Sequence, residues 1–335
     1  MTISGRAHPA PPLSIGMPVH NGENFLVAAL DSLLSQTFGD FELIISDNAS
    51  TDATLDICRA YAARDKRVRC LSSGTNIGAA ANFRRVFHEG GGRYFKWAAH
   101  DDLLAPDYLR QCMAMLAEDA SVILCHSQVA VIDEQGRTLR HERQETRNLA
   151  SDFPSQRFRA LVLSDLDNYE VFGVIRRQAL TRTPLIGGYI ASDRVLRAEL
   201  GLRGKFSLLP EPLFRNRDHR ARSIRRFPAH HRRGPWFDPQ RKSRIIFPHW
   251  RIFQEYFKCI DRVDELSAAE KRKSRLALLR WLTVHQNWAR LLADPVLVAA
   301  PSSERLLIRG GKLLAGNNAT TNGNTPAVQH GTPEK

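Results

Sequence analysis

Residues 13–22 have the sequence LSIGMPVHNG, an apolar run that ends abruptly in polar side chains. The apolar part, Leu13–Val19, is short and contains β-branched residues, which is typical of a buried strand. A second run of the same kind, Phe41–Ser46, is followed directly by Asp47 and Asn48. The segment between the two runs is long enough for a helix, so the chain is predicted to begin with a strand–helix–strand unit.

The same alternation continues along the first half of the chain. Further strands are predicted at Val68–Leu71, Tyr94–Ala99 and Val122–Val131. Between strands, apolar residues recur at helical spacing, as at Leu26, Leu30 and Leu33. This pattern predicts an α/β fold, with a mainly parallel, Rossmann-like sheet flanked by helices.

The rest of the sequence divides into further regions. We expect a tail at 1–11, the alternating half at 12–135, an irregular second half at 136–239, a helical extension at 240–316 and a disordered tail at 317–335.

The helical extension is predicted from two apolar stripes. They are Ile252, Tyr256 and Ile260, and then Leu276, Leu279 and Leu282. These helices could form a cap whose apolar face packs on the core. Because the basic run Lys271–Arg275 precedes the second stripe, they could also lie on an anionic membrane surface.

Composition excludes several classes of protein. The chain has 335 residues, of which 43% are hydrophobic and 25% charged, unlike disordered or collagen-like chains. No apolar run approaches the roughly 18 residues of a membrane span, and the N-terminus lacks the apolar core of a secretory signal. Five cysteines without a C-x-x-C pair argue against a disulfide framework or a zinc site and indicate a reducing cytosol.

Charge is distributed unevenly. Residues 1–150 carry 15 basic and 18 acidic side chains, whereas residues 151–335 carry 33 and 17. The basic half indicates an anionic partner, such as a phosphorylated ligand, a membrane surface or a nucleic acid.

Polar clusters follow three of the predicted strands. They are Pro18-Val19-His20-Asn21, Asp47-Asn48 and His100-Asp101-Asp102. Because the carboxyl ends of parallel strands share one edge of a sheet, these clusters are expected to meet in one crevice. Two adjacent carboxylates would repel a diphosphate unless a divalent cation lay between them.

Each cluster also has a purely structural interpretation. Asp47 could serve turn chemistry, and Asp101 and Asp102 could be a charge pair before a helix that begins near Pro106. The occurrence of all three clusters at strand ends favours a ligand site. No G-x-G-x-x-G follows the first strand and no P-loop motif is present, so a Rossmann dehydrogenase and a P-loop NTPase are both disfavoured.

Several of these segments together resemble a known family. They are Leu13–Gly22, Leu34–Phe38, Phe41–Asp52, Asn76–Gly78 and His100–Asp102. In this order they are similar to the family 2 glycosyltransferases of GT-A fold, strongly over residues 12–135, more weakly to about 225 and not beyond. The resemblance implies a nucleotide-diphospho-sugar donor, UDP- or dTDP-linked, and Mg or Mn as cofactor.

The resemblance also implies roles for individual residues. Pro18, Val19, His20 and Asp47 would hold the base and ribose, Asp101 would lie near the ribose and diphosphate, and Asp102 would be the metal ligand. Ala99 stands where the family often has the first Asp of Asp-x-Asp, so the roles of Asp101 and Asp102 are interchangeable. Ala81 stands where the family often has an arginine, which leaves Arg84 as the candidate partner of the phosphates.

The resemblance further implies a catalytic base, which in the family lies in an acidic pair at the start of a helix in the second half. The positional match is Asp193, which could instead be only a helix N-terminal charge. Asp165 and Asp167 are the alternative bases. A single base and direct displacement imply inversion at the anomeric carbon.

The Arg-rich segment 215–233 has two interpretations. It could be a solvated loop, or it could close over the donor diphosphate, with His219 as a secondary candidate for a metal or phosphate contact.

These inferences lead to one predicted function. The chain is expected to be a cytoplasmic, metal-dependent, inverting glycosyltransferase that acts on a cell-surface glycan or lipid-linked acceptor, with a possible peripheral contact to the inner face of the membrane. The alternatives are a polyanion- or nucleic-acid-binding protein, for which interleaved aromatic residues are lacking, and a catalytically dead GT-A homologue. A nucleotidylyltransferase would need a Gly-rich, Arg-containing loop after the first strand, and none is present.

Overall fold

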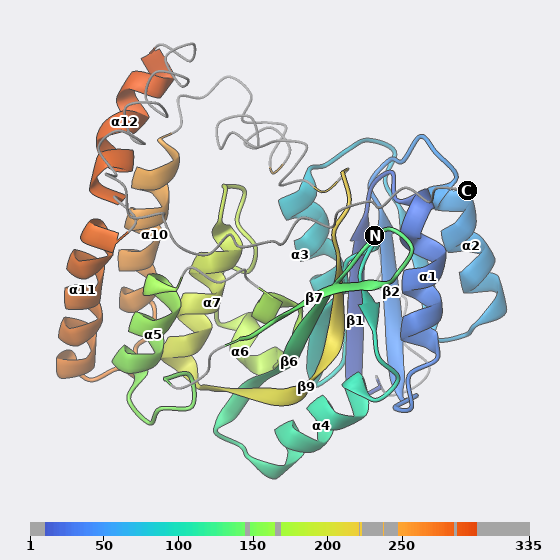
Figure 1. The fold of residues 1–335 in the computed structure, drawn as a ribbon, viewed down its shortest axis with the longest axis horizontal. Coiled ribbons are helices and arrows are strands. Elements are labelled where there is room, and N and C mark those ends of the chain that lie inside the picture. The colour runs from blue at the N-terminus through green and yellow to red at the C-terminus, as the bar shows by residue number, and fades with distance from the viewer. Residues whose placement is uncertain are drawn as a thin grey trace, which may run out of the picture.

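A mixed sheet of nine strands runs through the centre of the molecule, in the order β3-β2-β1-β4-β8-β6-β9-β5 with β7 paired to β6 (Figure 1). This computed structural model describes residues 11–144, 148–164, 169–220, 222, 237, 247–284 and 287–299.

The first half of the chain forms the parallel part of the sheet. Its strands are β1 (Leu13–Val19), β2 (Phe41–Asp47), β3 (Val68–Ser72) and β4 (Tyr94–Trp97), and its helices are α1 (Glu23–Leu34), α2 (Thr54–Arg64) and α3 (Ala79–Glu89). Strand β1 pairs in parallel with both β2 and β4, and β2 pairs in parallel with β3. The predicted mainly parallel, Rossmann-like sheet is therefore confirmed for this half.

The second half completes the sheet and makes it mixed. The chain continues through β5 (Leu103–Leu104), α4 (Tyr108–Glu118), β6 (Val122–Ile132), β7 (Thr138–Glu142), α5 (Pro154–Leu163), a 3-10 turn (Tyr169–Phe172), β8 (Val174–Arg176), α6 (Arg177–Thr181), α7 (Ser192–Arg203) and β9 (Lys205–Arg217). Strand β8 is antiparallel to β4 and β6, whereas β6 and β9 are parallel. The two halves thus share one sheet.

Apolar side chains pack on both faces of the sheet. Leu13, Ile15 and Met17 of β1 are fully buried against α1 and its neighbours. On the other face α3 lies so close that a Cβ on Gly16 would be 2.7 Å from Val86. Only glycine at this position lets α3 approach the strand.

The C-terminal helices form a separate outer layer, at the left edge of Figure 1. They are α10 (Pro248–Asp261), α11 (Ala268–Thr283) and α12 (Asn287–Ala299). The first predicted stripe, Ile252, Tyr256 and Ile260, is buried as expected. The second prediction is wrong for Leu276 and Leu279, which are 57% and 56% exposed, because α11 packs through Ala277, Leu278 and Trp281 instead. None of the helices in the described ranges is long and apolar enough to span a bilayer.

Candidate active site

The loops that follow β1 and β2 lie side by side at one edge of the sheet. Val19 and Asp47, the last residues of these strands, are register partners, and the Asn48 N–H donates to the Val19 carbonyl at 2.9 Å. A Cβ on Gly22 would be 2.5 Å from the His100 ring, so the loop after β4 also packs here. The structure therefore brings together the three polar clusters at the strand ends.

Asp47 has an unsatisfied oxygen in this crevice. Its side chain is buried, and its Oδ2 accepts the Ser50 N–H at 3.3 Å. Its Oδ1 and the neighbouring Ser46 Oγ are buried, and neither has a hydrogen-bond partner among the described residues. A buried polar atom without a partner typically costs about 1–3 kcal/mol, so these atoms are suited to a ligand that donates hydrogen bonds.

Hydrogen bonds connect Asn48, the residue after Asp47, to the Asn-x-Gly motif at residues 76–78. Asn48 donates to Asn76 Oδ1 at 3.0 Å and accepts the Ile77 N–H at 2.8 Å. The Asn76 amide nitrogen lies 3.4 Å from His20 Nε2. Among the sequence-predicted residues, His20 is exposed at the crevice, whereas the side chains of Pro18 and Val19 are buried in β1, which leaves their backbone for contacts with a ligand.

Asp101 and Asp102 are held by the end of β9. Asp101 Oδ2 lies 2.8 Å from His219 Nε2, while Asp102 Oδ1 accepts from the Asn216 amide and the Arg217 N–H, both at 2.9 Å. Arg217 Nε also donates to the Asp101 carbonyl. Asn216 and Arg217 carried no signal in the sequence beyond the start of a basic segment, so sequence analysis missed them.

The two carboxylates have different electrostatic environments. Burial and the charge of Asp101 raise the pKa of Asp102 well above its usual range. Burial also opposes ionisation of Asp101, but the hydrogen bond from His219 and the charges of His100 and His219 together outweigh burial, so the pKa of Asp101 is lowered. Asp102 is only 8% exposed and accepts hydrogen bonds from the end of β9, so it is a buried residue of the site.

The pair can accept a divalent cation, although no three His, Cys, Asp or Glu residues in the described ranges gather as a metal cluster. Within those ranges, Asp101 Oδ1 and Asp102 Oδ2 make no hydrogen bond. Mg²⁺ usually takes one or two protein carboxylates and completes its shell with water and substrate phosphates. The carboxylates of Asp101 and Asp102 are ligands of the type in that donor set.

Asp193 occupies the first turn of α7, as expected for the predicted base. Its side chain is partly exposed. Asp165 and Asp167, the alternative bases, and most of the segment 215–233 lie outside the described residues.

Backbone strain is concentrated in these loops. The non-glycine residues with positive φ in the described ranges are Asn21, Ala49, Leu185 and Ala191. The first two follow β1 and β2, and the other two flank the loop that leads into α7. Such conformations cost about 1–3 kcal/mol each and cluster at functional sites, which supports assigning these loops to the site.

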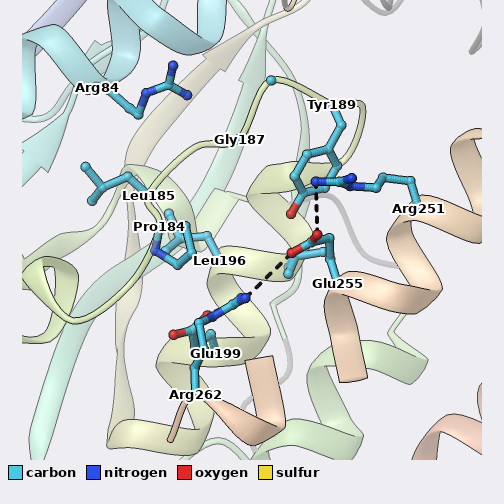
Figure 2. Close-up of a pocket in the computed structure, with 12 residues that line it drawn as sticks. Arg84, Pro184, Leu185, Gly187, Tyr189, Leu196, Glu199, Arg251, Glu255 and Arg262 are labelled. Atoms are coloured by element: carbon cyan, nitrogen blue, oxygen red, sulfur yellow. Dashed lines mark hydrogen bonds and ion pairs between the residues drawn. The ribbon is translucent and has the colours of Figure 1, made fainter. Parts of the chain in front are cut away.

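A pocket of about 250 Å³ lies beside the start of α7. Figure 2 shows Tyr189 and Arg251 on one side and Arg84 of α3 on the other. Arg84 donates to the Ile186 carbonyl at 2.8 Å, so this predicted phosphate partner is anchored to the loop before α7. Arg251 and Arg262 pair with Glu255 at 3.1 and 3.6 Å, and these charges line the pocket.

The sequence matches the model of the family described as glycosyl transferase family 2 over residues 14–183, which is half of the chain. The chain belongs to this family. The resemblance seen in the motifs is thereby confirmed.

Curated relatives match the first half of the chain. A putative glycosyltransferase EpsE of Bacillus subtilis is 33% identical over 127 residues, 38% of this chain and 46% of that protein. The chondroitin synthase of Escherichia coli is 32% identical over 130 residues, 38% of this chain and 19% of that protein. The match spans about half or less of the length of these relatives.

Solved structures of two other proteins have a similar fold. Staphylococcus aureus TarS (residues 1–349), solved with UDP-GlcNAc, superposes with a TM-score of 0.59 at 17% identity, over 85% of this chain and 81% of that one. A mannosyltransferase of Pyrobaculum calidifontis, solved with GDP-Man and Mn²⁺, gives 0.53 at 16% identity, over 92% and 81%. The GT-A-like fold is therefore confirmed.

Proposed function

We propose that this protein is a metal-dependent, inverting glycosyltransferase that uses a UDP- or dTDP-sugar. The observation that carries the proposal is the buried Oδ1 of Asp47 at the edge of the sheet, which has no hydrogen-bond partner among the described residues. A ribose hydroxyl or a base N–H would supply the missing hydrogen bond. The UDP-GlcNAc held by TarS, which shares the fold, supports a donor of this class.

A divalent cation, Mg or Mn, would be held by Asp101 and Asp102. When bound, it would neutralise the charge that develops on the departing diphosphate. Asn216 and Arg217 orient the Asp102 carboxylate, and His219 orients that of Asp101. The Mn²⁺ in the mannosyltransferase structure supports this assignment.

Asp193 would act as the general base. It would take the proton of the acceptor hydroxyl as the oxygen attacks the anomeric carbon from the face opposite the diphosphate. A single displacement of this kind inverts the configuration. The position of Asp193 at the start of α7, beside the strained Ala191, supports this role.

The acceptor would bind in the pocket beside α7. The Tyr189 ring offers a face on which a sugar ring can stack, and Glu255, Arg251 and Arg262 offer acceptors and donors for hydroxyl groups. The pocket is lined by Val195, Leu196 and Glu199 of α7, the helix whose first turn carries Asp193. We propose a cell-surface glycan or its lipid-linked precursor, with the enzyme in the cytoplasm at the inner face of the membrane.

The proposal is tested by thermal melting with UDP, dTDP and GDP, each with and without Mn²⁺, followed by a panel of nucleotide sugars. We expect UDP or dTDP to raise the melting temperature only when the cation is present. A polyanion-binding function would instead give stabilisation by DNA that disappears at high salt, and none by nucleotides. Equal nucleotide stabilisation in EDTA would contradict the role of the cation.

A further inference from the structure

The outer surface of the C-terminal layer is unusually apolar. Leu276 and Leu279 of α11 are 57% and 56% exposed, and Trp288 and Leu292 of α12 are 52% and 67% exposed. Single exposed apolar residues are common on proteins. Four large ones on two consecutive helices that pack against each other are more than such scatter explains, and exposed apolar residues on neighbouring elements typically mark a contact surface.

The fold does not need these four side chains for its core. Ala277, Leu278 and Trp281 of α11 and Leu291 of α12 already supply the buried contacts with the rest of the layer. In Figure 1 α11 and α12 lie at the edge of the molecule farthest from α1 and α2. Both helices therefore lie at the outer edge of the described part of the molecule.

Basic side chains flank the exposed leucines. Helix α11 carries five basic residues and one acidic residue. Arg272 and Arg280 lie four residues before and after Leu276, so all three share one helical face. Neither arginine makes an ion pair with any described residue, unlike Arg275, which pairs with Asp261 at 2.6 Å.

We propose that this outer face, formed by Leu276, Leu279, Trp288 and Leu292 with Arg272 and Arg280, docks on an anionic lipid membrane. Exposed apolar side chains on surface helices can enter the boundary between headgroups and acyl chains, while arginines pair with lipid phosphates and Trp lies at the interface. In a symmetric dimer through the same face, the unpaired arginines of one copy would approach those of the other, which is unfavourable. The proposal does not depend on glycosyl transfer.

Cosedimentation with vesicles tests the proposal. The full-length protein should bind vesicles of phosphatidylglycerol and phosphatidylcholine, be released by high salt, and bind phosphatidylcholine vesicles weakly. The double variant Leu276→Gln/Leu279→Gln should bind at least about tenfold more weakly, because two partly buried leucines are lost. A matched control is Val27→Gln/Leu139→Gln, which removes two exposed apolar side chains from α1 and β7.

The charges are tested separately. Arg272→Gln/Arg280→Gln should weaken binding to anionic vesicles by roughly fivefold for each arginine. Arg59→Gln/Arg64→Gln on α2 removes the same charge from the opposite end of the molecule and should have little effect.

Three results would overturn the proposal. The first is that the protein does not bind anionic vesicles at low salt, and the second is that the control variants lose as much vesicle binding as the test variants. The third is a lower melting temperature of Leu276→Gln/Leu279→Gln, which would show that these leucines are covered in the protein. A dimer that the leucine variant dissociates would assign the face to a second copy. Stabilisation by UDP and Mn²⁺ is measured on the same samples, so failure of the membrane proposal remains distinct from failure of the donor proposal.

Discussion

Asp47 is the side chain whose substitution best separates binding from folding. Asp47→Asn should weaken UDP or dTDP binding by about 1.5–3 kcal/mol, the size of a lost charge-assisted hydrogen bond. The same change replaces a buried carboxylate whose Oδ1 has no partner among the described residues, so the free energy of unfolding should stay the same or rise. Nucleotide titration and denaturant unfolding measure the two effects.

Asp52 provides the control for this substitution. It lies near the same edge, and its oxygens already accept the N–H groups of Thr54 and Glu23. Asp52→Asn should therefore leave nucleotide affinity nearly unchanged. If the Asp47→Asn variant and the wild type bind the nucleotide with equal affinity, Asp47 is only a turn residue.

Asp193 is tested by a change that keeps its size. Asp193→Asn removes the proton acceptor, so the transfer rate should fall by about 10²–10⁴-fold while stabilisation by donor and cation is retained. The loss should appear in kcat more than in KM, because the base acts in the transition state. If Asp193→Asn transfers sugar at the wild-type rate and Asp165→Asn or Asp167→Asn does not, the base lies on the other loop.

The acidic residues of the site could be predicted from the sequence, but the residues that hydrogen-bond to them could not. Asp47, Asp101 and Asp102 were predicted because strand-end polar residues share an edge in any parallel sheet. Asn216 and Arg217 could not be predicted, because their contact with Asp102 depends on how β9 joins the sheet more than a hundred residues later. Local patterns carry no information on such a pairing.

At the scale of elements, Arg262 ties α10 to α7. Its guanidinium contacts Glu199 at 2.7 Å and Glu255 at 3.6 Å, and the Glu199 side chain is almost fully buried. Arg262→Met should lower the free energy of unfolding by about 1–3 kcal/mol, because a buried carboxylate then retains only Arg203 as an ion-pair partner among the described residues. Chemical denaturation measures the change.

Arg275 is the matched control for this ion pair. It contacts Asp261 at 2.6 Å, but both side chains are about half exposed. Surface pairs of this kind contribute about 0–1 kcal/mol, so Arg275→Met should have a small effect. Equal effects of the two variants would show that the tie between α7 and α10 adds no stability.

The elements themselves were largely predictable. The predicted strand at Leu13–Val19 coincides with β1, because an apolar run between polar loops leaves little choice of boundary. The second stripe of the C-terminal region was misassigned. Helical periodicity finds apolar residues on one side of a helix, but α11 has apolar residues on two sides, and only the tertiary packing decides that Leu278 and Trp281 face inward.

For the whole molecule, stability should depend on pH through His126. This residue on β6 is 2% exposed, and burial, opposed in part by Glu170, lowers its pKa to about 4. In the unfolded chain a histidine has a pKa near 6.5, so between these values the unfolded state binds more protons and stability falls as pH falls. Protonation of His126 should therefore lower the free energy of unfolding by about 2 kcal/mol between pH 7 and pH 5.

The variant His126→Phe isolates this contribution. It keeps an aromatic ring on β6 without a titratable nitrogen, so its free energy of unfolding should fall less between pH 7 and pH 5 than that of the wild type. Denaturant unfolding at pH 7 and pH 5 measures how strongly the free energy of unfolding of each protein depends on pH. The same pH dependence in the variant and the wild type would show that carboxylates elsewhere account for it.

The excess of positive charge in the second half has a structural use that composition does not reveal. Arg176, Arg197 and Arg217 are bound to backbone carbonyls or buried carboxylates. Side chains held in this way connect strands and helices inside the molecule. A count of basic residues therefore overstates the charge that is available to an external partner.

The junction between β9 and the Asp101–Asp102 loop limits how this fold can be recombined. The family match ends at residue 183, and the relatives share the first half, yet Asn216, Arg217 and His219 come from the segment beyond it. A chimera that joined residues 12–135 to the second half of a relative would separate the carboxylates from these partners. The first half is thus not an exchangeable module unless the end of β9 is transferred with it.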